Sequence, residues 1–430
     1  MEISQSPVPG LLVLRIPVHG DNRGWFMENW QREKMVAAGL PDFGPVQHNV
    51  SYNNSAGATR GIHAEPWDKL VSVLVGRVFA AWVDLREGDS FGSTFTIELE
   101  PGVAVFVPRG VANSYQTLED GTAYSYLVNA HWSADAQYTN LYLEDETAAI
   151  AWPLPLREVS DKDLGHPRLA DVTPVAPRRS VILGADGQLG RALRALLPDA
   201  LALTRADLDL TDPAAYDSVA WKDVDTIYNA AAYTAVDKAE TPEGRTAAWA
   251  VNVTAVTTMA RIATEHGLTL VNVSSDYVFD GTAESHTVDE QVSPLGVYGQ
   301  TKAAGEAVTA TVPRHYIVRT SWVIGDGGNF VSTMQRLARD GVSPTVVDDQ
   351  HGRLTTAAEL AAGLVDLVQS GAPYGIHHLT GGGPVKTWAD IAREVFAAEG
   401  RDPADVTGVS TEVYGAGKDL APRPRHSALD

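Results

Sequence analysis

The spacing of apolar residues changes once along this 430-residue chain, near residue 175, and the change limits the folds that it can adopt. Before this point, short runs rich in β-branched and aromatic residues are separated by Gly, Pro, Asn and Asp, as in LLVLRIP, KLVSVLVGRVFAAWVDL, FTIEL, AVFVP and AYSYLVN. This spacing is typical of an all-β sandwich or barrel. After it, strand-like and helix-like runs alternate, as in SVILG followed by GQLGRALRALL, which predicts βαβ units around a parallel sheet.

The two patterns are separated by the stretch SDKDLGHPRLADVTPVAPRR. Because Pro167, Pro174 and Pro177 oppose regular structure, we expect no helix or strand in this stretch and assign its second half as a linker. At about 150 residues per domain, a chain of this length should form two or three domains. We therefore predict a multidomain protein, with one domain and its linker over residues 1–175 and a second domain over residues 176–430.

Composition and charge exclude several classes of protein. Hydrophobic residues make up 44% of the chain, yet no apolar run approaches the roughly 20 residues that a membrane span needs. The start, MEISQSPVPG, lacks the basic and apolar stretches of a signal peptide, and the absence of Cys excludes disulfides and thiolate metal sites. We expect a cytoplasmic protein. Its net charge of −21 would repel a nucleic acid, although a local basic pocket could still bind a nucleotide.

A glycine-rich turn follows the first strand of the second domain. Gly184, Gly187 and Gly190 lie where a strand passes into a helix, a turn that lets backbone N–H groups approach a pyrophosphate. The spacing GxxGxxG differs from the commoner GxGxxG, so the βαβ context carries the prediction of a dinucleotide site. The next predicted strand, over residues 201–203, ends near Arg205. This residue is either a partner for the 2′-phosphate of NADPH or a solvated surface Arg.

Three residues further along form a pattern suited to ketone reduction. Tyr298 and Lys302 are four residues apart and share one face of a predicted helix, and Ser275 ends the preceding strand. A phenol can protonate an alkoxide, a nearby cation can lower the pKa of that phenol, and a hydroxyl can hold the carbonyl oxygen. The trio therefore predicts a reductase that uses NADPH or NADH.

The second half resembles the dTDP-4-dehydrorhamnose reductase family of extended short-chain dehydrogenases. The resemblance covers residues 181–430 and includes GADGQLG, DLDLTD, NAAAYTAVDKAE, SSDYVFDG, VYGQTK, RTSWVIG, DDQHGRLTTAAELA and HHLTGGG. It implies a Rossmann fold with a small substrate-binding subdomain, and it makes Ser275, Tyr298 and Lys302 the catalytic residues. The positions that would contact the dinucleotide are Gly184, Gly187, Gln188, Leu189, Arg205, Asp209, Ala230, Ala231, Tyr298 and Lys302. Trp322 is either a substrate contact or a core residue, Asn252 is a weaker candidate, and Asp237, Lys238 and Glu240 are expected to be structural.

In the first half, polar residues occur where a sandwich should be apolar. Burial of such groups is unfavourable unless they are paired or functional. Arg60, His63 and Lys69 follow one another closely, and Gln47 and Asn49 lie one strand earlier. The half lacks the several His and the Glu of a metal-binding cupin, so we expect acid–base chemistry without a metal.

These segments resemble the dTDP-4-dehydrorhamnose 3,5-epimerase family over residues 10–171. The resemblance implies a cupin-like jelly roll, a homodimer formed through this domain, and a dTDP-sugar substrate. It makes His63 the base, Asp163 its partner, Lys69 the group that stabilises the enolate and Tyr126 the acid. The positions that match substrate contacts are Arg23, Phe26, Glu28, Gln47, Asn49 and Arg60. The chain departs from the family in TRGIHAEPWDK, where LRGLHYQ is common, and at Asn113 and His131.

The two resemblances name consecutive reactions, so we interpret the chain as a bifunctional enzyme of dTDP-L-rhamnose synthesis. One alternative is a fusion that makes another sugar, such as dTDP-6-deoxy-L-talose, because the sequence does not fix the face of hydride addition. Another is a binding or regulatory module that keeps the nucleotide fold without catalysis. The presence of Ser275, Tyr298 and Lys302 weighs against this last interpretation.

Overall fold

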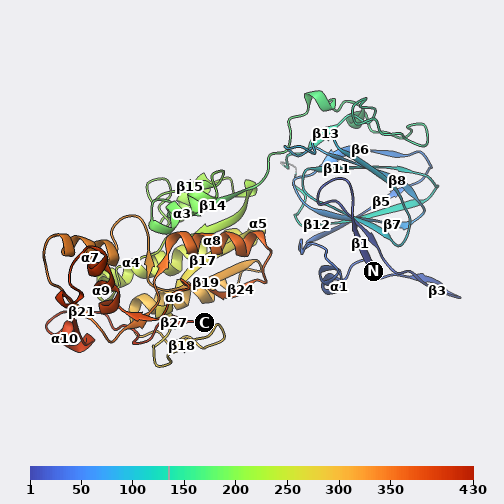
Figure 1. Ribbon diagram of the computed structural model, residues 1–430. Coiled ribbons are helices and arrows are strands. Elements are labelled where there is room, and N and C mark those ends of the chain that lie inside the picture. The colour runs from blue at the N-terminus through green and yellow to red at the C-terminus, as the bar shows by residue number, and fades with distance from the viewer. Residues whose placement is uncertain (134–135) are drawn as a thin grey trace. The chain divides into compact units, whose positions relative to one another are not determined.

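The computed structural model describes residues 1–133 and 136–430 and divides into two compact units, Met1–Pro177 and Arg178–Asp430 (Figure 1). Within the described residues, no helix combines the length and the apolar character that a membrane crossing requires. The predicted combination of an all-β unit with a parallel α/β unit is confirmed.

The first unit is a sandwich of two antiparallel sheets. The larger has the order β1-β2-β10-β7-β12-β5, with bounds Glu2–Gln5, Leu12–Arg15, Val103–Val107, Lys69–Val75, Thr122–Val128 and Gln47–Asn53. The smaller has the order β13-β6-β11-β8-β9, with bounds Thr139–Leu141, Thr59–Ala64, Val111–Thr117, Val78–Asp84 and Thr94–Leu99. This is the arrangement of a cupin-like jelly roll. A hairpin of β3 (His19–Asp21) and β4 (Gly24–Phe26) and a short helix α1 (Arg32–Ala37) precede β5.

Alternating residues from both sheets meet in a shared apolar core. Val71 and Val105 of the larger sheet pack with Trp82 and Tyr115 of the smaller one, and all four are buried. Because side chains of a strand point alternately to its two faces, every second residue of β5, β7, β12 and β6 points into this interior. Polar residues at those positions therefore face one another between the sheets.

The Pro-containing stretch is more structured than its prolines suggest. A one-turn helix, α2 (Asp161–Leu164), and a 3-10 turn, Leu169–Asp171, lie in its first half, so the expectation of no regular element is wrong there. Ser160 caps α2, and Pro167 follows its end, where a proline removes no helical hydrogen bond. In the second half, the Val175 N–H donates to the Leu85 carbonyl at 2.7 Å, so the first unit extends to this residue.

The second unit is built on a six-stranded parallel sheet of order β15-β14-β16-β17-β19-β24. The bounds in that order are Leu201–Leu203, Arg179–Leu183, Val224–Asn229, Thr269–Ser275, His315–Thr320 and Gly375–His378. The order reverses between β14 and β16, because β15 lies on one side of β14 and all later strands lie on the other. In open parallel sheets, ligands bind at the carboxyl ends of the strands beside such a reversal.

Helices cover both faces of this sheet, as in a Rossmann fold (Figure 1). Helices α3 (Gln188–Leu196) and α8 (Ala357–Gln369) pack on one face, where Leu193 and Leu364 meet Ile182 of β14. Helix α5 (Ala255–His266) packs on the other face, where Met259 meets Val181. Helix α4 (Pro242–Trp249) leads into α5 through a π turn, Ala250–Thr254, and α6 (Val297–Thr309) lies against α5 and β17.

A smaller core lies beside the sheet. Helices α7 (Phe330–Arg339) and α9 (Trp388–Ala398) bury Met334 and Phe396 against strand β21 (Thr345–Val347), which pairs with β26 (Thr407–Val409). Short helix α10 (Thr411–Gly415) and three two-stranded pairs complete the unit: β18 (Ser285–His286) with β27 (Ala428–Leu429), β20 (Val323–Ile324) with β23 (Thr355–Thr356), and β22 (His351–Gly352) with β25 (Lys386–Thr387).

We predict that each unit folds by itself, because each encloses its own apolar core. Expression of residues 1–177 and of residues 178–430 as separate proteins should give two soluble products. Each should show a cooperative thermal transition in calorimetry, at a temperature within a few degrees of one found in the full chain. Aggregation of both fragments would contradict the independence of the two units.

Candidate active sites

The register of the strands brings six predicted site residues into the interior of the sandwich. Asn49 lies opposite Tyr126, and Gln47 and Lys69 both lie opposite Val128, so these side chains share the inner face of the larger sheet. His63 is on β6 of the smaller sheet. Its neighbour Ile62 packs with Val83 in an apolar cluster separate from the core between the sheets, so His63 points to the opposite, inner face. Arg60 lies opposite Tyr115, a residue of the inner core. The structure therefore places cations, amides and an imidazole in one space.

His63 and Asp163 form a hydrogen-bonded pair across 100 positions of sequence. Nε2 of His63 lies 2.7 Å from Oδ1 of Asp163, and the Gly61 N–H donates to the other carboxylate oxygen at 3.2 Å. A Cβ atom on Gly61 would lie 2.4 Å from Asp163 Oδ1, so only glycine lets the carboxylate reach the strand. Ser160, the cap of α2, accepts a hydrogen bond from the Asp163 N–H and fixes this turn.

The environment of Asp163 keeps it ionised. Burial opposes ionisation of this carboxyl, but hydrogen bonds from His63 and Ser160 outweigh it and lower the pKa to about 2. An ionised carboxylate accepts hydrogen bonds, so Nε2 of His63 carries the proton of the pair and Nδ1 is left as a proton acceptor. This is the tautomer that a general base requires.

Lys69 and Tyr126 lie on neighbouring strands of the inner face, and the charge of Glu65 acts on both. The side chain of Lys69 is buried, and its Nζ lies 2.9 Å from Oε2 of Glu65, which also accepts a hydrogen bond from Trp67 Nε1 at 2.7 Å. Burial raises the pKa of Tyr126, and the negative charge of Glu65 raises it further, whereas Arg60 opposes the shift. Tyr126 is therefore held as a neutral phenol, which can donate a proton.

Three predicted substrate contacts lie apart from this interior. Arg23 is on the β3–β4 hairpin, where its guanidinium pairs with Asp21, and its side chain is 85% exposed. Phe26 ends the same hairpin and is 65% exposed, and Glu28 pairs with Lys34 at the surface. In a single chain, the side chains of Arg23, Phe26 and Glu28 are therefore exposed to solvent.

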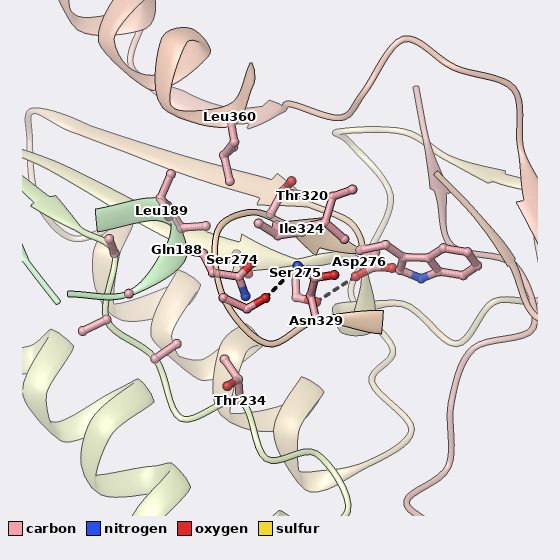
Figure 2. A pocket seen from close by; sticks show the side chains of 18 of the residues that line it. Gln188, Leu189, Thr234, Ser274, Ser275, Asp276, Thr320, Ile324, Asn329 and Leu360 are labelled. Atoms are coloured by element: carbon pink, nitrogen blue, oxygen red, sulfur yellow. Dashed lines mark hydrogen bonds between the residues drawn. The ribbon is translucent and has the colours of Figure 1, made fainter. Parts of the chain in front are cut away.

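In the second unit, a cavity of about 720 Å³ opens at the carboxyl ends of β14, β16, β17 and β19. Gln188, Ser275 and Thr320 all point into it (Figure 2). Buried Oε1 of Gln188 and Oγ1 of Thr320 have no hydrogen-bond partner within the described part of the chain. Buried polar atoms are normally satisfied, so these two indicate a polar ligand.

The glycine-rich turn shapes one wall of the cavity. Gly184 has φ of +77°, and a Cβ atom there would lie 2.9 Å from the backbone of Ala231. A Cβ atom on Gly190 would lie 2.2 Å from the Gly184 carbonyl oxygen, so this glycine lets α3 pack against the turn. Gly187 precedes α3 and provides no side-chain cap, which leaves N–H groups at the start of the helix for an anion.

Ser275, Tyr298 and Lys302 line the same cavity. The Lys302 ammonium donates to the Val273 carbonyl at 2.5 Å, and burial lowers its pKa to about 8 despite the opposing charge of Glu306. Burial raises the pKa of Tyr298 to about 12, although hydrogen bonding with Ser275 opposes the shift. At neutral pH, the site therefore combines a neutral phenol with a charged ammonium group.

The remaining cofactor and substrate candidates divide into two groups. Ala230, Ala231 and Leu189 line the cavity, as does Trp322, whose ring stacks on Trp388 at a centroid distance of 3.8 Å. Trp322 has φ of +43°, a strained conformation for a large side chain that tends to occur at functional sites. Asp209 instead accepts hydrogen bonds from Thr211, and Arg205 is exposed just after β15.

Other polar residues hold the elements around the cavity in place. Glu240 Oε1 accepts a hydrogen bond from the Val297 N–H at 2.8 Å and so caps α6, the helix that carries Tyr298. Buried Asn252 bonds both backbone groups of Tyr233. Asp237 accepts hydrogen bonds from Ala421 and Arg423 near the carboxyl end of the chain.

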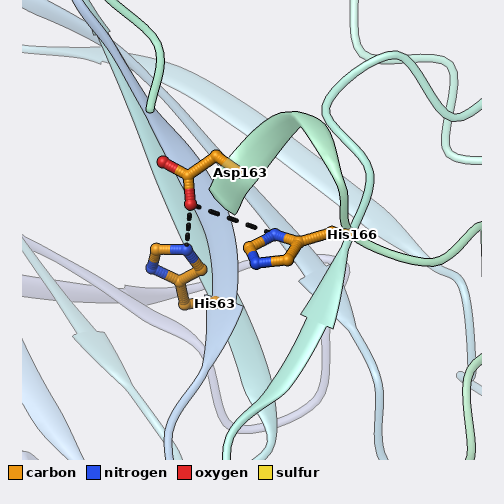
Figure 3. Close-up of side chains that lie close together, drawn as sticks. All are labelled: His63, Asp163 and His166. Carbon is orange, nitrogen blue, oxygen red and sulfur yellow. Dashed lines mark hydrogen bonds and ion pairs between the residues drawn. The ribbon is translucent and has the colours of Figure 1, made fainter. Parts of the chain in front are cut away.

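The structure adds three residues that the sequence did not single out. Asp276 is buried beside Ser275, whose hydroxyl donates to it at 2.8 Å, and burial raises its pKa to about 7. Glu65 pairs with Lys69, a contact that their spacing of four residues could have suggested. His166 lies next to Asp163, three residues further along, and its ring meets the edge of the His63 ring at 5.3 Å (Figure 3).

Comparison with known proteins places each unit in a family. The family described as "RmlD substrate binding domain" matches residues 178–430, and the dTDP-4-dehydrorhamnose 3,5-epimerase family matches residues 5–171. The chain belongs to both families. It therefore contains an epimerase domain and a reductase domain of the dTDP-rhamnose pathway in one polypeptide.

Relatives of each domain support this assignment. A protein from Streptococcus pyogenes named "Protein RmlC homolog" is 47% identical over 179 residues, which cover 40% of this chain and 90% of that protein. A dTDP-4-dehydrorhamnose reductase from Mycobacterium tuberculosis is 41% identical over 263 residues, 58% of this chain and 84% of that protein. A reductase from Bacillus anthracis, solved with NADP, is 33% identical with a TM-score of 0.55 and covers 59% of this chain and 90% of its own.

We predict that Gly190→Ala destabilises the reductase domain by about 1–3 kcal/mol, the usual effect of overpacking a rigid site. The added methyl group would meet a backbone carbonyl, which cannot rotate away. Gly328→Ala is the matched control, because it lines the same cavity and a Cβ atom there meets nothing within 4 Å. Calorimetry of the full chain should show a lower reductase transition for Gly190→Ala alone. Equal transitions in both variants would contradict the close approach.

Proposed function

We propose that this chain catalyses two consecutive steps on one nucleotide sugar. The epimerase domain inverts carbons 3 and 5 of dTDP-4-dehydro-6-deoxy-D-glucose, and the reductase domain then reduces the 4-ketone with NADPH to give dTDP-L-rhamnose. The proposal rests on one observation above all: a hydrogen-bonded His–Asp pair and a Ser–Tyr–Lys trio occur in one chain, each inside the domain whose family performs the matching reaction.

In the epimerase domain, we assign proton removal to Nδ1 of His63. The hydrogens on carbons 3 and 5 are acidic because each carbon adjoins the C4 ketone, and their removal gives an enolate. Asp163 holds the imidazole by its Nε2–H and stabilises the imidazolium that forms when the proton arrives. Lys69 supplies positive charge to the enolate oxygen, and the neutral phenol of Tyr126 returns a proton on the other face.

In the reductase domain, NADPH supplies the hydride that adds to C4 of the sugar. Tyr298 donates its phenolic proton to the oxygen that becomes the C4 hydroxyl, and Lys302 stabilises the negative charge that the phenol then carries. The hydroxyl of Ser275 donates to Asp276 in the free enzyme and would turn to donate to the carbonyl oxygen when the substrate binds. The N–H groups at the start of α3 would hold the pyrophosphate, and Gln188 and Thr320 offer unpaired oxygens to the rest of the dinucleotide.

The preference for NADPH over NADH rests on Arg205. This residue follows β15, the strand beside the glycine-rich turn, and Gly184 donates to the last carbonyl of β15 at 3.0 Å. A cation near this point can pair with a 2′-phosphate, whereas an acidic residue would favour the 2′-hydroxyl of NADH. Asp209 would then support the adenosine side indirectly, through the turn that it makes with Thr211. We place both reactions in the cytoplasm.

We further propose that the epimerase domain forms a homodimer. Trp25 and Phe26 are at least half exposed on the hairpin of β3 and β4, which projects from the unit (Figure 1). Val50 and Tyr52 are also exposed, on the edge strand β5. A second copy would cover this surface and let the partner supply Arg23, Phe26 and Glu28 to the substrate. Sedimentation velocity should give a dimer for the wild type and a monomer for Phe26→Asp, with Val413→Asp, at an exposed position of the other domain, as control. A monomeric wild type would contradict this.

We predict that Tyr298→Phe lowers NADPH oxidation by at least about 10²-fold, the usual contribution of a general acid. The substitution removes only the hydroxyl, so the fold of the cavity should persist. Deuterium exchange at carbons 3 and 5 in the same protein serves as the internal control and should continue at the wild-type rate. Near-normal NADPH oxidation by this variant would exclude Tyr298 as the proton donor.

We predict that His63→Ala abolishes exchange of solvent deuterium into carbons 3 and 5, measured by NMR without NADPH. Tyr126→Phe should retain part of the exchange but lose inversion, because only the return proton is missing. His48→Ala is the matched control, since His48 lies on β5 and its ring bonds Ser125. Exchange at the wild-type rate in His63→Ala would place the base elsewhere.

The stereochemistry of the product separates this proposal from its alternative. A reductase from Streptomyces niveus named "dTDP-4-keto-6-deoxy-D-glucose reductase" is 40% identical over 260 residues, so related domains are named for a different sugar. NMR of the nucleotide sugar formed by the complete enzyme should show the rhamno configuration at C4. A talo configuration would show that the final product is dTDP-6-deoxy-L-talose, formed by the same two types of reaction.

A further inference from the structure

A second imidazole lies beside the catalytic pair His63–Asp163 and has no role in the chemistry above. His166 follows α2 closely, and Nδ1 of its ring lies 3.9 Å from Asp163 Oδ1, the oxygen that also meets His63 (Figure 3). Only 7% of its side chain is exposed. The two imidazoles thus approach one carboxylate oxygen from different elements of the fold.

The ring of His166 is buried and only partly satisfied by the protein. Its Nδ1 lies 3.9 Å from Asp163 Oδ1, which is too long for a hydrogen bond, and the backbone of Leu141 supplies a polar contact to the ring. A single backbone partner can satisfy one ring nitrogen, so the other remains available to a ligand that is not part of the protein.

The three side chains provide the donor set of a metal site. Nitrogen of His63, oxygen of Asp163 and nitrogen of His166 all lie within 4.8 Å of one another. Atoms bound to one tetrahedral zinc ion at about 2.0–2.2 Å are separated by about 3.3–3.6 Å, so these atoms need to shift by only about 1 Å or less. Asp163 is already fixed by Gly61 through its other oxygen, which leaves Oδ1 directed at both rings.

We propose that His63, Asp163 and His166 form a binding site for a divalent transition metal, Zn²⁺ by its donor set, and that the bound ion switches off the epimerase. A neutral imidazole that binds a metal through one nitrogen carries its proton on the other. A metal on Nε2 of His63 therefore displaces the proton shared with Asp163 and leaves the remaining ring proton on Nδ1. His63 then has no lone pair for the substrate. The inhibition rests on the proposed function, whereas the metal site does not.

Metal binding is tested first, without substrate. Isothermal titration of the chelator-treated full chain with Zn²⁺ should show one tight site per chain. Loss of a residue that only hydrogen-bonds a metal ligand typically lowers metal affinity by about 10- to 100-fold. His166 is proposed as a ligand itself, so His166→Asn should weaken Zn²⁺ binding by at least about 100-fold. His166→Gln is a second variant in case the first does not fold, and His377→Asn removes an imidazole from the other domain as the matched control. Equal affinity in the wild type and both His166 variants overturns the site.

Inhibition is then measured as deuterium exchange at carbons 3 and 5 with and without Zn²⁺. The wild type should lose exchange in proportion to occupancy of the tight site and regain it with chelator, and the reductase reaction of the same chain should not respond. Each His166 variant should keep its own metal-free rate of deuterium exchange at the zinc concentrations that inhibit the wild type. Tight binding with unchanged exchange would overturn the switch and keep the metal site. Absence of exchange in the metal-free wild type would instead contradict the proposed function.

Discussion

Burial of charge is the constraint on which both domains depend. An unpaired charge inside an apolar core is strongly unfavourable, so each buried ionic group needs a partner at a defined position. In the reductase domain, the guanidinium of Arg319 is 2% exposed and lies 2.8 Å from Glu306, which also accepts a hydrogen bond from Ser274 at 2.5 Å. This pair ties β19, α6 and β17 together directly behind Lys302. The position of the catalytic ammonium therefore follows from an ion pair that never meets the substrate.

The epimerase domain solves the same problem with two separate pairs. Asp163 holds the imidazole of His63 by a hydrogen bond, and Glu65 neutralises Lys69 from within the connection between β6 and β7. Because Lys69 has its own carboxylate in Glu65, Asp163 is left to orient the imidazole of His63 in the same interior. Only five residues separate His63 from Lys69 in TRGIHAEPWDK, which departs from the commoner family pattern. Glu65 lies in this short connection and pairs with Lys69, so the lysine can be buried there.

Local patterns predicted the elements well, but not the long-range partners. The glycine-rich turn, the strand over Leu201–Leu203 and the alternation of strands and helices all follow from short-range spacing, which folding preserves. The expectation drawn from the prolines was wrong, because a proline restricts only its own residue and the one before it. A one-turn helix therefore ends before Pro167, and a 3-10 turn fits between Pro167 and Pro174. His166 could not be found from the sequence, because its importance depends on Asp163 reaching β6 through a gap that only Gly61 provides.

In the function proposed here, the two sites make opposite demands on the same ketone, and this accounts for their different architecture. Epimerisation needs the C4 oxygen to hold negative charge while a base and an acid act on neighbouring carbons, and the proposed base and acid project from two facing sheets. Reduction needs the same oxygen to receive a proton as hydride arrives at C4, so its residues converge from one strand and one helix at the edge of a sheet. A single cavity could not place Tyr126 opposite a base and Tyr298 beside the carbonyl oxygen at once. Fusion of two complete domains keeps both geometries intact in one chain.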